Sequence, residues 1–157
     1  TTVFAISHVA YLLMLPAEES PAGGGVGLVI YLVFLTQFND VAQYIWGKKF
    51  GNRKIVPAIS PNKTWAGFLG GVATTTLLGA VLAPWLTPIG WGLGLAAGLL
   101  IGLAGFIGDL TVSAVKRDLR IKDTSQLIPG HGGILDRIDS LMYTAPLFFH
   151  FLVYTTY

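Results

Sequence analysis

Residues 66–110 read AGFLGGVATTTLLGAVLAPWLTPIGWGLGLAAGLLIGLAGFIGDL, and Asp109 is the one charged side chain among them. A helix needs about 20 apolar residues to cross the hydrocarbon core of a bilayer. The quoted run contains two stretches of that length, 66–86 and 90–110, and the segment that joins them, residues 84–90, contains two prolines. These residues predict a pair of transmembrane helices joined by a tight turn.

The rest of the chain contains three further apolar stretches, at 1–15, 25–46 and 141–156. We therefore expect an all-α fold, a polytopic bundle of about five transmembrane helices, of which the first and last are truncated. Trp85 and Trp91 flank the predicted turn as interfacial aromatics do. Small residues that permit close helix approach recur in the two central helices: Gly70, Gly71, Gly79, Gly92, Gly94, Gly98, Gly102 and Gly105.

The composition excludes an ordinary water-soluble domain. Of the 157 residues, 53% are hydrophobic and only 11% are charged, where soluble domains carry about 25% charged residues. The absence of cysteine excludes disulfides and thiolate metal sites. We interpret residues 1–157 as a single membrane domain. Because the sequence begins with Thr-Thr rather than Met, we expect it to be a fragment of a longer polytopic protein.

The ten cations indicate an orientation. They occur only in two segments, 47–65 and 111–140, and an even number of predicted spans separates these segments. Both segments therefore face the same side, which the excess of Lys and Arg marks as cytoplasmic. The predicted N-terminus lies on that side too. The ten are Lys48, Lys49, Arg53, Lys54, Lys63, Lys116, Arg117, Arg120, Lys122 and Arg137.

Four aspartates fall at or within the ends of the predicted spans: Asp40, Asp109, Asp136 and Asp139. A carboxylate at membrane depth is costly, so each requires a partner, a proton or a metal. Helix capping or an interfacial ion pair is the alternative to a functional role for each of them.

The spacing places further groups beside these carboxylates. If the fourth helix continues past the membrane, Asp109, Ser113, Lys116 and Arg120 share one face. Between this face and Asp136 lies a glycine turn, 129–133, whose backbone amides can approach an anion. Carboxylates suit Mg²⁺, and cations offset charge at a reacting phosphorus. These are the parts of a nucleotidyl-transfer site, although the spacing alone names no substrate.

Residues 113–139 read SAVKRDLRIKDTSQLIPGHGGILDRID. They resemble the signature of phosphatidate cytidylyltransferases, S-x-x-K-R-x4-K-D followed by H-G-G-x-x-D-R-x-D, at every fixed position. Upstream, Asn39-Asp40, Tyr44, 47–51 and 59–65 also resemble that family, so the likeness covers about residues 37–140.

The resemblance implies that CTP and phosphatidic acid are joined to give CDP-diacylglycerol and pyrophosphate. It implies a magnesium site formed by Asp109, Asp136 and Asp139, and it is compatible with a monovalent cation such as K⁺ beside it. The catalytic group would comprise these aspartates with Lys116 and Arg117. Substrate-binding residues would be Asp40, Ser60, Lys63, Ser113, Lys122, Asp123, His131, Gly132, Gly133 and Arg137.

Two of these roles have open alternatives, because His131 can equally stabilise its turn and Asp123 can simply pair with Lys122. The resemblance further implies membrane lipid and a second copy of the chain as partners, and no nucleic acid. The implied location is the bacterial inner membrane, with the active site facing the cytoplasm.

The chain departs from the family pattern at three positions. Ala66 stands where the family commonly has Glu, which would reduce activity or alter the substrate if that Glu orients a catalytic group. Val41 and Gln43 also differ from the commonest bacterial pattern, with an expected effect on local packing. An inactive or specialised relative, a scaffold and a transporter are the alternatives. A CDP-alcohol phosphotransferase is a further one, but its D-G-x-x-A-R element is not present in this order.

Overall fold

The computed structural model describes residues 2–16, 22–120 and 139–157. All regular secondary structure in these ranges is helical, apart from one isolated bridge between Lys54 and Thr64. The helices are α1 (Thr2–Met14), α2 (Gly25–Phe50), α3 (Trp65–Leu86), α4 (Trp91–Asp118) and α6 (Leu141–Thr155). The predicted all-α fold is confirmed.

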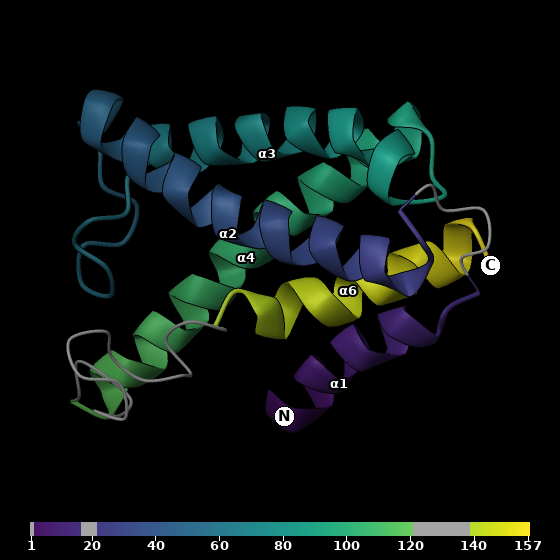
Figure 1. Cartoon of the computed structure of the whole chain (residues 1–157). Coiled ribbons are helices and arrows are strands. Elements are labelled where there is room, and N and C mark those ends of the chain that lie inside the picture. The colour runs from purple at the N-terminus through teal and green to yellow at the C-terminus, as the bar shows by residue number, and fades with distance from the viewer. Residues whose placement is uncertain (1, 17–21, 121–138) are drawn as a thin grey trace.

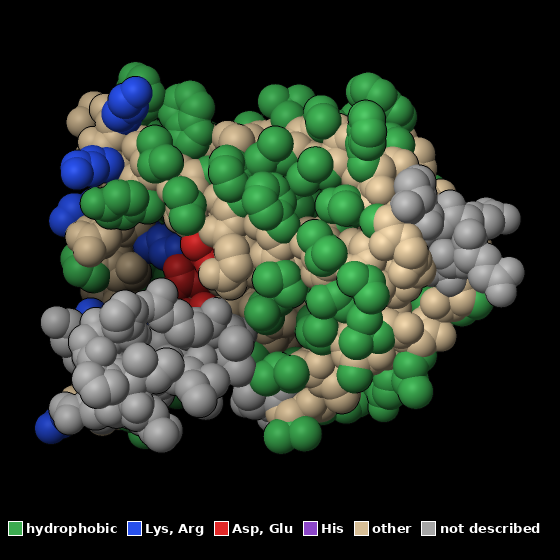
Figure 2. All heavy atoms as spheres, in the orientation of Figure 1, with side chains coloured by type: hydrophobic (Ala, Val, Ile, Leu, Met, Phe, Trp, Pro, Cys, Tyr) green, Lys and Arg blue, Asp and Glu red, His purple; other side chains and the backbone are tan. Residues whose placement is uncertain are grey.

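Three of these helices, α2, α3 and α4, are long and apolar enough to cross a membrane. Helices α1 and α6 are equally apolar but have 13 and 15 residues, fewer than the about 20 that a full span requires. Hydrophobic side chains are spread over much of the described surface of the bundle in Figure 2, as expected where lipid replaces water as the solvent. The chain is a polytopic helical membrane protein.

The described parts of the two basic segments lie at the same end of the bundle, as their sequence positions predict. The C-terminal end of α2, the loop of residues 51–64 and the C-terminal end of α4 meet there (Figure 1). Lysine and arginine side chains gather at this end in Figure 2, which we call the basic end. At the opposite end, Trp85 and Trp91 are largely exposed, consistent with interfacial aromatics.

Helices α3 and α4 pack with their backbones almost in contact, as the glycine pattern predicts. A Cβ at Gly79 would lie 2.7 Å from the Cα of Gly98, and a Cβ at Gly98 would lie 2.8 Å from the Thr75 carbonyl oxygen. No larger residue fits at either position without a shift of backbone. The glycines therefore fix the distance between the two helices.

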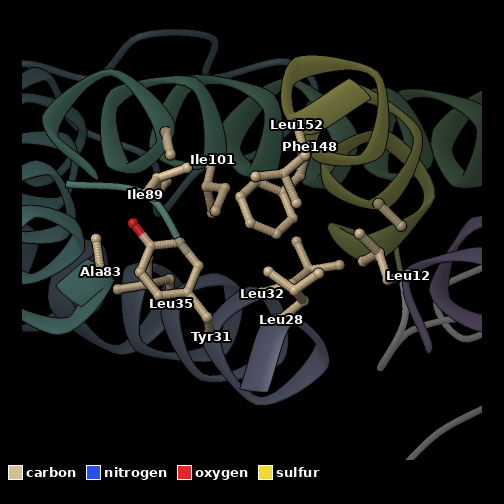
Figure 3. Close-up of a cluster of buried hydrophobic side chains, with 12 residues drawn as sticks. Leu12, Leu28, Tyr31, Leu32, Leu35, Ala83, Ile89, Ile101, Phe148 and Leu152 are labelled. Carbon is tan, nitrogen blue, oxygen red and sulfur yellow. The ribbon is translucent and has the colours of Figure 1, made fainter. Parts of the chain in front are cut away.

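A buried tyrosine ties α2 to this pair. The Tyr31 hydroxyl donates to the Gly79 carbonyl oxygen at 2.9 Å, and its ring stacks on Phe148 of α6 with centroids 5.4 Å apart. Figure 3 shows the surrounding cluster of fully buried side chains, which includes Leu32, Leu35 and Ile101. This core holds α2, α3, α4 and α6 in one bundle.

Polar contacts closer to the basic end hold α2 in register with its neighbours. The buried Asn39 side chain donates to the Gly102 carbonyl oxygen at 3.3 Å and accepts from the Thr75 hydroxyl at 3.1 Å. The Thr36 hydroxyl donates to that of Thr144 in α6. Because Asp40 follows Asn39 directly, these bonds also set the position of its carboxylate.

Two expectations about helix ends need correction. Helix α3 ends at Leu86, as the 66–86 stretch predicts, but it includes Pro84, so the turn predicted at 84–90 begins only after Leu86. Helix α4 does continue past residue 110, but it ends at Asp118, and Arg120 has a positive φ of 56°. Arg120 therefore does not lie on the helical face that carries Asp109 and Ser113.

Candidate active site

A cavity of about 200 Å³ opens at the basic end between α2, the 51–64 loop, α3 and α4. All four of these elements contribute side chains to its wall, so it depends on the packing of the whole bundle. The lining residues are Asp40, Gln43, Tyr44, Ser60, Asn62, Lys63, Thr64, Gly67, Phe68 and Asp109.

An ion pair crosses this cavity from Lys63 to Asp109. The lysine also donates to the Gln43 side-chain oxygen at 3.3 Å and lies 5.2 Å from the centroid of the Phe106 ring. Only 17% of the lysine side chain and 26% of the aspartate side chain are exposed. Partial burial lowers the effective dielectric constant, so this pair interacts more strongly than one on an open surface.

The 51–64 loop is folded so that Lys63 faces inward. The backbone of Ile55 donates to the Lys63 carbonyl oxygen at 3.0 Å, and that of Trp65 donates to Arg53 at 3.0 Å. The Thr64 side chain then caps α3 by accepting from the Gly67 amide at 3.2 Å. Lys63 therefore sits between a paired loop and a capped helix, which restricts its position.

Glycines let the end of α2 approach this cap. A Cβ at Gly51 would lie 2.1 Å from the Gly47 carbonyl oxygen and 2.5 Å from the Thr64 hydroxyl oxygen. A Cβ at Gly67 would lie 2.6 Å from the Gln43 carbonyl oxygen. The glycines on either side of Lys48-Lys49-Phe50 thus serve close packing beside the cavity.

Two further carboxylates lie near Asp109. The Ser140 hydroxyl donates to the Asp40 carboxylate at 3.2 Å, and the Ser140 amide donates to Asp139 at 2.8 Å. Burial, reinforced by the nearby Asp109 carboxylate, raises the pKa of Asp139 to about 6. Negative charge is therefore concentrated where α2, α4 and the start of α6 meet, and an added cation would be favourable there.

The last turns of α4 connect this site to the 51–64 loop. The Ser113 hydroxyl donates to Asp109 at 3.4 Å, and the Arg117 guanidinium donates to the Ile59 carbonyl oxygen at 3.2 Å. Lys116 is near enough to act on the Asp139 carboxyl. Together with the Lys63–Asp109 pair, these contacts bring the two basic segments into one site.

Comparison with known proteins places the chain in a family. A model of the "Cytidylyltransferase family" matches residues 1–155. The chain belongs to the cytidylyltransferase family.

Several curated relatives share its sequence. An uncharacterized protein, YnbB of Escherichia coli K12, is 54% identical over 156 residues, 99% of this chain and 52% of that protein. A phosphatidate cytidylyltransferase of Brucella suis is 41% identical over 81% of the chain and 47% of its own length. One of Synechocystis is 49% identical over 73% of the chain and 39% of its own length. The chain spans about half the length of these relatives or less.

The structure brings together the eight predicted site residues that lie in its described ranges. Lys63 and Asp109 form the central pair, Asp40 and Ser60 line the cavity, and Ser113, Lys116, Arg117 and Asp139 adjoin them. The remaining predicted residues fall outside the described ranges: Lys122, Asp123, His131, Gly132, Gly133, Asp136 and Arg137.

Sequence reasoning did not assign six of the cavity-lining residues to the site: Gln43, Tyr44, Asn62, Thr64, Gly67 and Phe68. Asn62 belongs to the upstream motif that carries the resemblance, so its place in the motif was an available signal. Phe68 stands one helical turn after the Thr64 cap and packs on Phe106 with centroids 4.5 Å apart. In the sequence, Gln43 stands out only as a departure from the commonest bacterial pattern of the family, with an expected effect on local packing.

Two of the three predicted magnesium ligands, Asp109 and Asp139, lie in the described ranges. Carboxylate oxygens are the ligands that Mg²⁺ prefers, and Asp40, Asp109 and Asp139 influence one another electrostatically. No three such side chains in the described ranges are arranged to hold an ion by themselves. The donor chemistry therefore fits a hard cation, with Asp136 as the predicted ligand outside those ranges.

Proposed function

We propose that the chain is the catalytic membrane region of a phosphatidate cytidylyltransferase. The observation that carries this proposal is the Lys63–Asp109 pair, which joins two basic segments around a cavity at one end of a membrane bundle. Curated relatives named phosphatidate cytidylyltransferase support the choice of reaction. Because the chain spans about half of their length, the activity is a proposal for the whole protein.

In the proposed reaction, a phosphate oxygen of phosphatidic acid attacks the α-phosphorus of CTP. A new bond forms between that oxygen and the α-phosphorus, and the bond from the α-phosphorus to the oxygen bridging it to the β-phosphorus breaks. The products are CDP-diacylglycerol and pyrophosphate. Both substrates carry phosphate groups, so the site must accommodate high negative charge close to a membrane.

The cations of the basic end supply the balancing charge. Lys63 and Lys116 would bind phosphate oxygens, and Arg117 would do so while holding the 51–64 loop through Ile59. Charge-assisted contacts of this kind stabilise the additional negative charge of a phosphoryl-transfer transition state. Ser60, at the cavity wall, would donate a further hydrogen bond.

A magnesium ion completes the proposed site. Asp109 and Asp139, with Asp136, would hold it, and the bound ion would supply Lewis-acid polarisation of phosphate oxygens. Asp40, which accepts a hydrogen bond from Ser140, would add a further carboxylate beside the ion. A monovalent cation such as K⁺ is compatible with the same group of carboxylates.

The proposed setting is the bacterial inner membrane, with the basic end facing the cytoplasm. The concentration of lysine and arginine at that end supports this orientation, and CTP is supplied from the cytoplasm. We also propose a homodimer, by resemblance to the family.

Product identification tests the proposed function. The purified protein, reconstituted with phosphatidic acid, is incubated with CTP and Mg²⁺, and lipid products are identified by mass spectrometry. Appearance of CDP-diacylglycerol supports the proposal. Its absence at every Mg²⁺, Mn²⁺ and K⁺ concentration would reject it, whereas product from CDP-diacylglycerol and an alcohol would instead indicate a CDP-alcohol phosphotransferase.

A further inference from the structure

Gln43 occupies an unusual position in the cavity wall. Gln43 is only 6% exposed, although it lines an open cavity together with Lys63 and Asp109. Its side chain crosses Gly71 of α3 so closely that a Cβ at Gly71 would lie 2.3 Å from the Gln43 Cγ. The glycine thus makes room for this glutamine and fixes where its amide group points.

The contact with Lys63 determines which way the amide faces. A lysine ammonium group offers only donors, so the atom that it meets at 3.3 Å must be the carbonyl oxygen of the amide. The opposite orientation would place an NH₂ group against an ammonium group. The nitrogen Nε2 is therefore the amide atom that does not contact Lys63.

That nitrogen is buried and has no hydrogen-bond partner in the described part of the chain. Buried polar atoms without partners are rare in proteins, because desolvation is not offset by a new hydrogen bond. An NH₂ donor on a residue that lines this cavity beside a lysine is suited to an anionic oxygen acceptor. A phosphate oxygen would satisfy both groups at once.

We propose that Gln43 contacts the substrate directly. Its carbonyl oxygen holds the Lys63 ammonium group, and its amide nitrogen donates to a phosphate oxygen of the bound substrate. This inference rests on the proposed function for the identity of the phosphate, which belongs either to CTP or to phosphatidic acid. The expected packing role is then only part of what this residue does.

A binding experiment shows whether Gln43 contacts a phosphate of CTP or the phosphate of phosphatidic acid. Dissociation constants for CTP and for a short-chain phosphatidic acid are measured in detergent with the wild type and with Gln43→Met, which keeps the length but has no amide. We expect about a tenfold weaker affinity for one of the two ligands, the usual effect of losing a hydrogen bond to a charged group. Gln37→Met is the matched control, since Gln37 lies on the same helix outside the cavity.

A double-mutant cycle then isolates the direct contact. If Gln43 acts only by holding Lys63, Gln43→Met has no further effect in a Lys63→Ala background. A direct contact predicts a further loss of affinity in that background. Unchanged affinity for both ligands in the single variant, or a loss that vanishes in the double variant, overturns the proposal.

Separate measurements show whether the variant folds and whether the wild type forms the CDP-lipid product. The midpoint of thermal unfolding in detergent shows whether Gln43→Met folds, and Gln43→Ala replaces it if it does not. Because binding is measured at equilibrium, a wild type that binds CTP but forms no CDP-lipid contradicts the proposed reaction and leaves the Gln43 contact testable. A wild type that turns over, with affinities unaffected by Gln43→Met, contradicts the contact alone.

Discussion

Lys63, in the loop before α3, forms an ion pair with Asp109 in the last third of α4. The pair joins the upstream basic segment to the helix that leads into the downstream one. A lysine that neutralises an aspartate in this way can also donate to phosphate oxygens, because an ammonium group has three donors. The ion pair explains why two segments far apart in the sequence both resemble the same family.

The first prediction concerns Lys63. Lys63→Ala should raise the KM for at least one substrate about tenfold or more, because a partly buried aspartate loses its partner and phosphate loses a cation. Steady-state kinetics with each substrate varied in turn measures this effect. Lys49→Ala removes an exposed cation at the same end of the bundle and should change KM by less than about twofold. Equal effects of the two substitutions would remove Lys63 from the site.

The second prediction concerns Asp109. Asp109→Asn should lower kcat about 100-fold or more, since it deletes one charge from the carboxylate group while changing little volume. Activity across a range of Mg²⁺ concentrations measures the loss. Asp118→Asn, on the exposed end of the same helix, is the control and should retain activity. If Asp109→Asn turned over at the wild-type rate, Asp109 would be neither a ligand nor an anchor for Lys63.

The third prediction concerns Gly71. Gly71→Ala should destabilise the protein by about 1–3 kcal/mol, as overpacking of a filled contact does, because its Cβ would meet the Gln43 side chain at 2.3 Å. Thermal unfolding in detergent gives the change. Gly92→Ala is the control, since nothing lies within 4 Å of a Cβ there. Adding Gln43→Ala should recover part of the lost stability, and no recovery would mean that the two side chains do not compete for the same space.

The fourth prediction concerns Ala66 in the first turn of α3. Ala66→Glu should stabilise that helix by about 0.3–1 kcal/mol, because a negative charge near a helix N-terminus is favourable. Its effect on kcat tests the departure from the family pattern. Higher kcat would mean that the alanine limits turnover, whereas unchanged kcat with intact folding would mean that this position does not orient a catalytic group.

Much of the fold follows from sequence because lipid imposes strict requirements. Apolar length predicted α2, α3 and α4, since a backbone in hydrocarbon must satisfy its own hydrogen bonds. The glycines of α3 and α4 predicted their close approach, which Gly79 and Gly98 now show. The even number of predicted spans between the two basic segments placed them at one end, and Figure 1 shows the described parts of both segments there.

Helix ends and side-chain partners were harder to predict. Pro84 remains within α3 because only the last turn follows it, and a proline there costs little helical bonding. Arg120 lies beyond the end of α4, so a spacing argument that extended the helix misplaced it. The partner of Asp109 could not be read from sequence, because the pairing depends on how the 51–64 loop folds back over α3.

The cavity residues show the same limit. Asp40, Ser60 and Lys63 were identified from motifs, whereas Gln43 enters the site only because Gly71 leaves space for it one helix away. Contacts of this kind are set by tertiary packing and leave no periodic signal in either helix.

The fate of the phosphates of CTP tests the central claim most directly. The protein is incubated with phosphatidic acid, Mg²⁺ and CTP labelled at either the α- or the γ-phosphate, and label is measured in lipid and in pyrophosphate. Our account predicts that α-label appears only in lipid and γ-label only in pyrophosphate, in equal amounts, with both signals lost in Asp109→Asn. Label that stays in CTP, or γ-label that reaches the lipid, would contradict it.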